Sequence, residues 1–122
     1  MTDAVFVFGS NEAGRHGRGA ALFARQQRGA IYGQGVGRQG QSYAIPTKDD
    51  DLRPLPLRSI GLYVAAFLAY ACAHPHETFE LTPIGCGLAG YKPSDIAPMF
   101  SNAPDNVRLP VSFVHELQRP QR

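Results

Sequence analysis

Three separate segments of the chain carry residue types that can bind an anion or supply an amine nucleophile. Residues 82–91 place three glycines directly after an apolar run and before a predicted helix start. Glycines at such a junction let backbone N–H groups turn inward without interference from a Cβ atom, which suits a phosphate or pyrophosphate. A second glycine-rich turn follows the apolar residues 4–8, and Lys48 follows a third apolar run. The alternative for each glycine turn is a tight turn that binds no ligand.

The hydrophobic pattern predicts the elements that must hold these segments. Apolar runs without polar alternation predict strands that are covered on both faces. Apolar residues at helical spacing from Leu57 to Ala71 predict the longest helix, whereas the glycine-rich residues 29–42 predict an irregular connection. The predicted strands are residues 4–8, 42–47, 79–84 and 107–114, and the predicted helices are residues 19–27, 57–73 and 95–101.

The alternation of strands and helices predicts an α/β protein with a mostly parallel mixed sheet. Pro110 in the last predicted strand indicates a sheet edge or a bulge, and Asp95 is predicted to cap its helix. His74 and His76 are predicted to interact with the carbonyl groups that end the preceding helix. In open α/β sheets, ligands bind beyond the carboxyl ends of the strands. Both glycine turns and Lys48 fall at such ends, so we expect them to converge in one crevice.

The composition indicates one globular domain. The 122 residues predict a single domain over residues 1–117 and a frayed tail over residues 118–122. The net charge of +2 does not by itself indicate a nucleic-acid-binding protein, and the arginines between residues 15 and 38 form either a solvated face or an anion-binding mouth. Two cysteines without metal-ligand spacing argue against a disulfide framework or a metal site. The longest apolar stretch, residues 61–72, is too short to span a bilayer. We expect a cytoplasmic protein without a cofactor or membrane contact.

The motifs together resemble those of macrodomains, the ADP-ribose-binding fold. Residues 7–11 resemble the family's strand that ends in asparagine, and residues 16–21 resemble the glycine-rich segment that opens a helix. Residues 82–88 resemble the second phosphate loop, which wraps the diphosphate and the distal ribose, and residues 44–48 look like the lysine-bearing strand of the TARG- and DarG-type ADP-ribosylglycohydrolases. The resemblance covers residues 4–114 and implies a three-layer α/β/α sandwich that binds ADP-ribose.

The chain departs from the macrodomain pattern at three places. It begins at the asparagine-bearing strand, without the family's preceding strand and helix and without the acidic residue that usually holds adenine. Ala21 stands about where another branch carries a catalytic aspartate, so the resemblance does not support that mechanism. Ala89 and Gly90 stand where the vertebrate TARG-type enzyme carries an aspartate, which leaves only the lysine of that pair, as in DarG-type relatives. The small size and the locally basic half suit a bacterial or phage protein.

Each candidate side chain also has a purely structural interpretation. Lys48 either pairs on the surface with Asp49, Asp50 and Asp51 or acts as a nucleophile on the anomeric carbon of an opened ribose, which requires a neutral amine. The amide of Asn11 can bond a ribose hydroxyl or form a turn. His16 can act as a general base or be an ordinary loop side chain.

The same duality holds for three further side chains. Arg18 can clamp a phosphate or remain solvated, and Tyr91 can stack on a sugar or base or pack against the protein. Cys86 can be a reactive thiol or a small buried residue, and we expect the latter.

We therefore hypothesise that the protein binds ADP-ribose or a related nucleotide diphosphate sugar and hydrolyses it from an ADP-ribosylated protein or nucleic acid. One alternative is a non-catalytic reader or sensor, and another is a small assembly protein whose glycine turns are structural; a homodimer is compatible with each. The predicted catalytic residues are Lys48 and His16, and the predicted ligand-binding residues are Gly9, Ser10, Asn11, Gly17, Arg18, Gly19, Ala20, Thr47, Ile84, Gly85, Cys86, Gly87, Leu88, Ala89, Gly90 and Tyr91.

Overall fold

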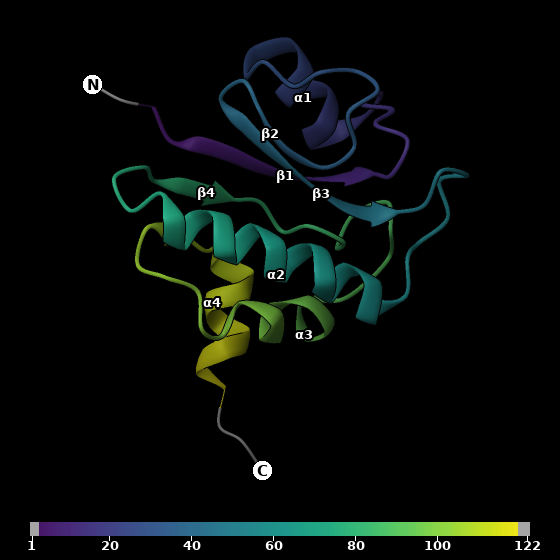
Figure 1. Ribbon diagram of the computed structural model, residues 1–122. Coiled ribbons are helices and arrows are strands. Elements are labelled where there is room, and N and C mark those ends of the chain that lie inside the picture. Colours follow the sequence, from purple (N-terminus) through teal and green to yellow (C-terminus); the bar gives the residue numbers. More distant parts are fainter. Residues whose placement is uncertain (1–2, 120–122) are drawn as a thin grey trace.

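A computed structural model describes residues 3–119 of the chain, and a five-stranded sheet with the order β2-β3-β1-β4-β5 lies at its centre (Figure 1). β1 pairs in parallel with β3 and β4, and β4 pairs in parallel with β5. β2 is antiparallel to β3. This arrangement confirms the predicted α/β class with a mostly parallel mixed sheet. The strands are β1 (Val5–Asn11), β2 (Gly37–Gln39), β3 (Ser42–Lys48), β4 (Phe79–Leu81) and β5 (Val107–Arg108).

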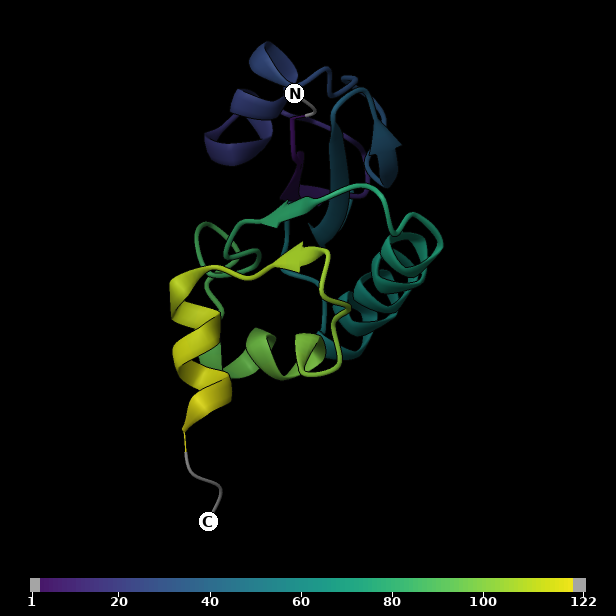
Figure 2. The same ribbon diagram turned by 90° about the vertical axis from the view of Figure 1, so that its left-hand side faces the viewer.

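Helices cover both faces of the sheet, which confirms the three-layer sandwich. α1 (Gly19–Gln27) lies on one face by itself, and the remaining helices lie on the other (Figures 1 and 2). Those helices are α2 (Leu57–Ala73), α3 (Pro93–Ile96), the short 3₁₀ helix η1 (Ala97–Phe100) and α4 (Val111–Gln118).

The two faces of the central strands have unequal cores. Alternate residues of β1 point to opposite sides, so Val7 joins the larger core under α2, and Phe8 joins the smaller core under α1. The larger core takes up the predicted apolar stripe of α2, where Ile60, Val64 and Phe67 are buried. The absence of polar alternation in β1 therefore has the physical cause expected from the sequence: the strand is covered on both faces.

The end of the chain differs from the expectation. Residues 107–114 do not form one strand, because β5 ends at Arg108 and α4 begins at Val111. Pro110 marks neither a bulge nor an edge; it is the residue before the first turn of α4, where its fixed φ (−67°) and missing N–H cost nothing. β-branched residues made this segment resemble a strand, but Phe113 is buried in the larger core from a helix. The predicted tail over residues 118–122 begins at the last residue of α4, and residues 120–122 lie outside the described part of the chain.

Three smaller differences concern element boundaries. The connection over residues 29–42 is not wholly irregular, because it contains β2. β4 ends at Leu81, three residues earlier than predicted. Asp95 does not precede its helix but is the third residue of α3, from which its carboxylate accepts a hydrogen bond from the N–H of Lys92 (2.9 Å). His74 behaves as expected, since its Nδ1 lies 2.7 Å from the carbonyl oxygen of Tyr70 near the end of α2.

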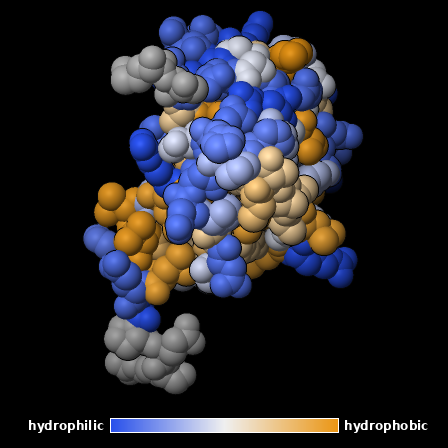
Figure 3. All heavy atoms as spheres, turned by 60° about the vertical axis from the view of Figure 1, so that its left-hand side comes forward, coloured by the Kyte–Doolittle hydropathy of each residue, from blue (hydrophilic) through white to orange (hydrophobic). Residues whose placement is uncertain are grey.

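The surface also differs between the two halves. Hydrophilic side chains dominate the upper part of Figure 3, whereas hydrophobic side chains gather in the lower part. Among the exposed large hydrophobic residues is Val111, the first residue of α4. In the part of the chain that the structure describes, no helix has the length and apolar character needed to cross a membrane.

Candidate functional site

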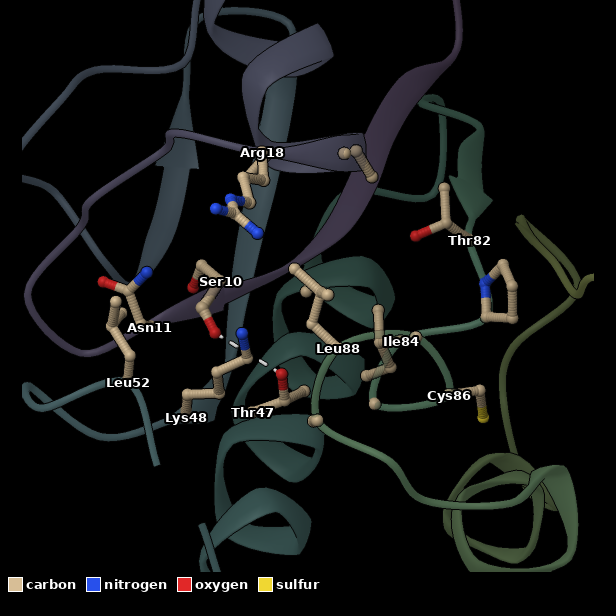
Figure 4. Close-up of a pocket in the computed structure, with 18 of the residues that line it drawn as sticks. Ser10, Asn11, Arg18, Thr47, Lys48, Leu52, Thr82, Ile84, Cys86 and Leu88 are labelled. Atoms are coloured by element: carbon tan, nitrogen blue, oxygen red, sulfur yellow. Dashed lines mark hydrogen bonds between the residues drawn. The ribbon is translucent and has the colours of Figure 1, made fainter. Parts of the chain in front are cut away.

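A pocket of about 520 Å³ opens at the carboxyl ends of β1, β3 and β4, where the sequence predicted a crevice (Figure 4). Two glycine-rich segments flank it: the first loop, residues 12–18 between β1 and α1, and the second loop, residues 82–92 between β4 and α3. All of the predicted site residues except His16, Gly90 and Tyr91 line the pocket. The remaining lining residues are Arg15, Ala21, Leu52, Thr82 and Pro83.

The first loop is held by side-chain hydrogen bonds. Asn11 at the end of β1 bonds the main chain of Arg15 twice: its Oδ1 accepts from the N–H (2.8 Å), and its Nδ2 donates to the carbonyl (3.0 Å). Gly14 adopts a left-handed φ of +74° and lies so close to the backbone of Gln34 that a Cβ atom would collide with it. Asn11 therefore forms the turn that the structural interpretation expected, and it keeps one amide hydrogen for a ligand.

His16 belongs to the first loop but does not line the pocket. Its side chain is fully buried, its ring meets the Phe8 ring edge-on, and its Nε2 lies 2.9 Å from the Gln34 carbonyl oxygen and 3.1 Å from Oε1 of Gln39. Both partners are acceptors, so Nε2 carries the hydrogen, and Nδ1 has no partner among the described residues. Hence His16 anchors the loop to β2. The prediction that it acts as a general base is corrected, because it cannot reach a ligand in the pocket.

The second loop is held mainly by its own backbone. Its internal hydrogen bonds run from Cys86 N–H to Pro83, from Gly90 N–H to Gly87 and from Tyr91 N–H to Gly85. Four residues of this loop line the pocket with N–H groups that donate to no acceptor among the described residues: Gly85, Gly87, Leu88 and Ala89.

The start of α1 supplies a further set of donors. The helix has no side-chain cap at Arg18, so the N–H groups of its first turn remain available where Gly19, Ala20 and Ala21 line the pocket. Nothing lies within 4 Å of where a Cβ would stand on Gly17 or Gly19, which leaves the backbone open to a ligand. Both loops thus present backbone donors to the same cavity, as an anion site requires.

Lys48 extends into the pocket from the end of β3. It is paired with Asn11 across the strands, and its carbonyl accepts from the N–H of Glu12 (3.0 Å). Figure 4 shows the amine of Lys48 and the guanidinium of Arg18 pointing toward the same region from opposite sides. Within the described part of the chain, Lys48 makes no ion pair, so the surface pairing with the aspartates that follow it is not found.

Those aspartates form a turn instead. The Asp49 carboxylate accepts from the N–H groups of Asp51 (2.9 Å) and Arg53 (3.0 Å), which closes a tight turn after β3. The turn places Leu52 at a left-handed φ of +64° on the rim of the pocket, with 45% of its surface exposed. No pattern in the sequence pointed to Leu52, because a leucine in that backbone conformation is uncommon.

The pocket is electropositive in its side chains. Arg15, Arg18 and Lys48 line it, and the described lining residues include no carboxylate and no imidazole. Cys86 also lines it, but burial raises the pKa of its thiol, and its sulfur points away from Lys48 in Figure 4. The cavity is therefore suited to an anion and lacks an acid–base side chain next to the lysine.

Tyr91 and Gly90 lie at the far end of the second loop, outside the pocket. The Tyr91 hydroxyl donates to the carbonyl of Leu55, and the ring packs against the larger core. The prediction that Tyr91 stacks on a ligand is therefore corrected in favour of packing. Gly90, with a φ of +83°, serves the turn rather than the cavity.

Comparisons with known proteins give little beyond the fold. No protein-family model matches the sequence, and no curated protein shows significant similarity to it. The structure is similar to that of a protein of unknown function from Bacteroides thetaiotaomicron, with a TM-score of 0.53, 18% identity and coverage of 84% of this chain and 82% of that chain. At this identity the likeness concerns the fold alone.

Proposed function

We propose that the pocket binds ADP-ribose or a related nucleotide diphosphate sugar, and that the protein releases this group by hydrolysis from a modified macromolecule. The proposal rests on one observation: backbone donors from two loops and three cationic side chains converge on one cavity. A diphosphate is the part of such a ligand that these groups would bind. The volume of about 520 Å³ lies within the range of small-molecule sites, roughly 300–1,000 Å³.

In this proposal the two ends of the pocket bind different parts of the ligand. The N–H groups of the second loop and of the α1 start, with Arg15 and Arg18, hold the diphosphate. The distal ribose lies at the other end, where Asn11 and Lys48 are paired neighbours on β1 and β3. The remaining amide hydrogen of Asn11 donates to a ribose hydroxyl, which directs the anomeric carbon toward the lysine.

Lys48 then acts as the nucleophile. Its neutral amine forms a bond from Nζ to the anomeric carbon, and the bond from that carbon to the modified group breaks. The leaving group keeps the electron pair of that bond and takes the proton lost by the amine. The sugar ring opens to a Schiff base as a second proton moves from nitrogen to the ring oxygen. Water adds to the anomeric carbon, the carbon–nitrogen bond breaks, and ADP-ribose leaves with the amine restored, so that one water molecule is consumed.

A non-catalytic reader of ADP-ribose is the second candidate. It is favoured by the lack of a carboxylate or imidazole among the described lining residues, because proton transfer to a leaving group usually needs such a side chain. Both candidates use the same pocket and differ only in turnover.

Calorimetric titration of the purified protein with ADP-ribose, and with AMP as the control, tests the shared part of the proposal. Micromolar binding of ADP-ribose with much weaker binding of AMP is the expected result. Equal affinity for the two nucleotides, or no binding of either, would contradict a pocket built around a diphosphate and a distal ribose.

Turnover is tested with ADP-ribosylated protein and DNA substrates and with borohydride, which reduces a Schiff base to a stable amine. Lys48 and Lys92 are the two lysines of the chain, and Lys92 lies outside the pocket, so Lys92→Ala is a matched control for Lys48→Ala. We expect the parent and Lys92→Ala to release ADP-ribose and to be trapped at Lys48, and Lys48→Ala to do neither. Release by Lys48→Ala at the parent rate would refute the nucleophile; binding without release by the parent would identify a reader.

A further inference from the structure

The neutral hydroxyl groups that line the pocket already donate within the protein. Ser10 donates its hydroxyl hydrogen to the carbonyl of Gly35, and Thr82 donates to the carbonyl of Val7 (2.8 Å). Thr47 points its hydroxyl at the carbonyl of Ser10 (3.4 Å), the contact drawn as a dashed line in Figure 4. Each hydroxyl hydrogen is thus used to join neighbouring strands or loops, and none is left to read the edge of a ligand.

The amide of Asn11 is mostly used as well. Its oxygen and one of its hydrogens hold the main chain of Arg15, which leaves one N–H donor at the Lys48 end of the pocket. This donor is assigned above to the distal ribose. A bound nucleotide would therefore meet three kinds of side-chain group: cations, one amide hydrogen and apolar surface.

Two features that read a nucleobase are missing from the described lining. It includes no aromatic ring on which a base could stack and no carboxylate that could accept from a base amino group. Instead, apolar side chains lie near the mouth: Leu52 on the turn after β3, and Leu88 on the second loop, with exposed fractions of 45% and 66%. Apolar contacts cover the face of every base alike and do not distinguish one edge from another.

We propose that the pocket recognises the diphosphate and the distal ribose and tolerates any base, so that its ligands are nucleoside diphosphate riboses as a class. This inference rests on the proposed function and specifies which parts of the ligand the pocket recognises. Charge-assisted hydrogen bonds from Arg15, Arg18 and the loop N–H groups supply the affinity, and they are about twice as strong as neutral ones. The base contributes buried apolar area against Leu52 and Leu88 and no selectivity.

Calorimetry with ADP-ribose, GDP-ribose and CDP-ribose, together with inorganic pyrophosphate, tests the inference. We expect the three nucleotides to bind with dissociation constants within about fivefold of one another, because a single base-reading pair of hydrogen bonds would separate them by about 1–3 kcal/mol, or roughly 5- to 150-fold. Preference for ADP-ribose by more than about tenfold over both others would overturn base tolerance.

Two variants separate the parts of the ligand. Leu88→Ala should weaken the binding of all three nucleotides by the same factor and leave the binding of pyrophosphate unchanged. Arg18→Gln should weaken the binding of all four ligands. Arg58→Gln, an exposed arginine of α2 outside the pocket, is the matched charge control and should change none of them. A Leu88→Ala effect confined to one nucleotide would overturn the inference.

The outcomes also separate the inference from the proposed function. Binding of ADP-ribose alone would leave the proposed function standing and overturn base tolerance. Binding of pyrophosphate without any nucleoside diphosphate ribose would overturn both and leave an anion pocket of another kind. Binding of none of the four ligands would overturn the anion pocket itself.

Discussion

The two loops that flank the pocket are built in opposite ways. The first loop is fastened from outside, by the amide of Asn11, by buried His16 and by the close approach of Gly14 to the backbone of Gln34. The second loop is joined to the rest of the protein near its ends, where Thr82 donates to Val7 and Tyr91 donates to Leu55. Its middle is held by hydrogen bonds within the loop, exposes Leu88 and leaves open space around Gly87. We infer that the first loop is preformed and that the middle of the second loop adapts to the ligand, since a segment with few outside contacts opens at low free-energy cost.

The largest expected effect comes from adding a methyl group to each loop. Gly14→Ala should lower the free energy of unfolding by about 2–4 kcal/mol, because it combines a left-handed φ with a collision against backbone atoms. Gly87→Ala, whose added Cβ would meet nothing within 4 Å, should change the free energy of unfolding by less than about 1 kcal/mol. Urea denaturation of both variants measures the difference.

Equal loss of stability in these two glycine variants would remove the contrast between the loops. Gly87→Ala should still weaken the binding of ADP-ribose, because the backbone of Gly87 lies where the diphosphate is proposed to bind. The calorimetric titration described above provides that second measurement.

A smaller effect is expected from the buried imidazole. His16→Ala should cost about 2–3 kcal/mol of stability, because it leaves a cavity beside Phe8 and takes a partner from Gln39. His76→Ala, on the exposed segment after α2, is the matched control and should be near neutral. Retention of ligand affinity by folded His16→Ala protein would agree with an anchoring role. A pH-dependent loss of turnover without loss of stability would instead restore His16 as a catalytic residue.

The smallest effect concerns the support of the first loop by α2. The Tyr63 hydroxyl donates to the carboxylate of Glu12, and this bond is the main cause that raises the pKa of Tyr63 from 10.0 to about 12, ahead of desolvation. The protonated form is favoured in the folded state, so the stabilisation is complete below pH 10 and is lost as the pH rises toward 12.

Tyr63→Phe should therefore be less stable than the parent by under about 1 kcal/mol at neutral pH, a small value because the pair is near solvent. The difference should shrink between pH 10 and pH 12. Thermal denaturation across this range measures it, and Tyr32→Phe, at an exposed position, is the control. A difference that grows with pH would contradict the direction of the pKa shift.

The contrast between the loops also explains which parts of the molecule the sequence could predict. β1, β3 and α2 follow from apolar runs and helical spacing, since burial alone determines them. The glycines of both loops could be identified because a turn that needs backbone freedom is indicated by glycine residues in the sequence. The role of His16 was missed because it depends on Gln39 in β2, a strand of three residues that an isolated pattern cannot reveal.

The end of the chain was missed for a different reason. Valine and phenylalanine at residues 111–114 favour a strand locally, but packing of Phe113 and Leu117 against the larger core, one helical turn apart, favours a helix. Leu52 was missed because its conformation depends on the turn closed by the Asp49 carboxylate, which accepts from the N–H groups of Asp51 and Arg53 on either side of it. The helix at the end of the chain thus depends on tertiary contacts, and the conformation of Leu52 depends on a local side-chain hydrogen-bond network.

The pairing of β1 with distant strands determines when the pocket can form during protein synthesis. β1 emerges from the ribosome before both of its neighbours, β3 (Ser42–Lys48) and β4 (Phe79–Leu81), so this central strand is not enclosed until β4 has been synthesised. Such non-local pairing slows folding and leaves apolar strands uncovered in the meantime. We expect pulse-chase proteolysis of stalled nascent chains to detect protection only after residues beyond the second loop have emerged. Until then, Val5 to Phe8 would be a binding segment for chaperones.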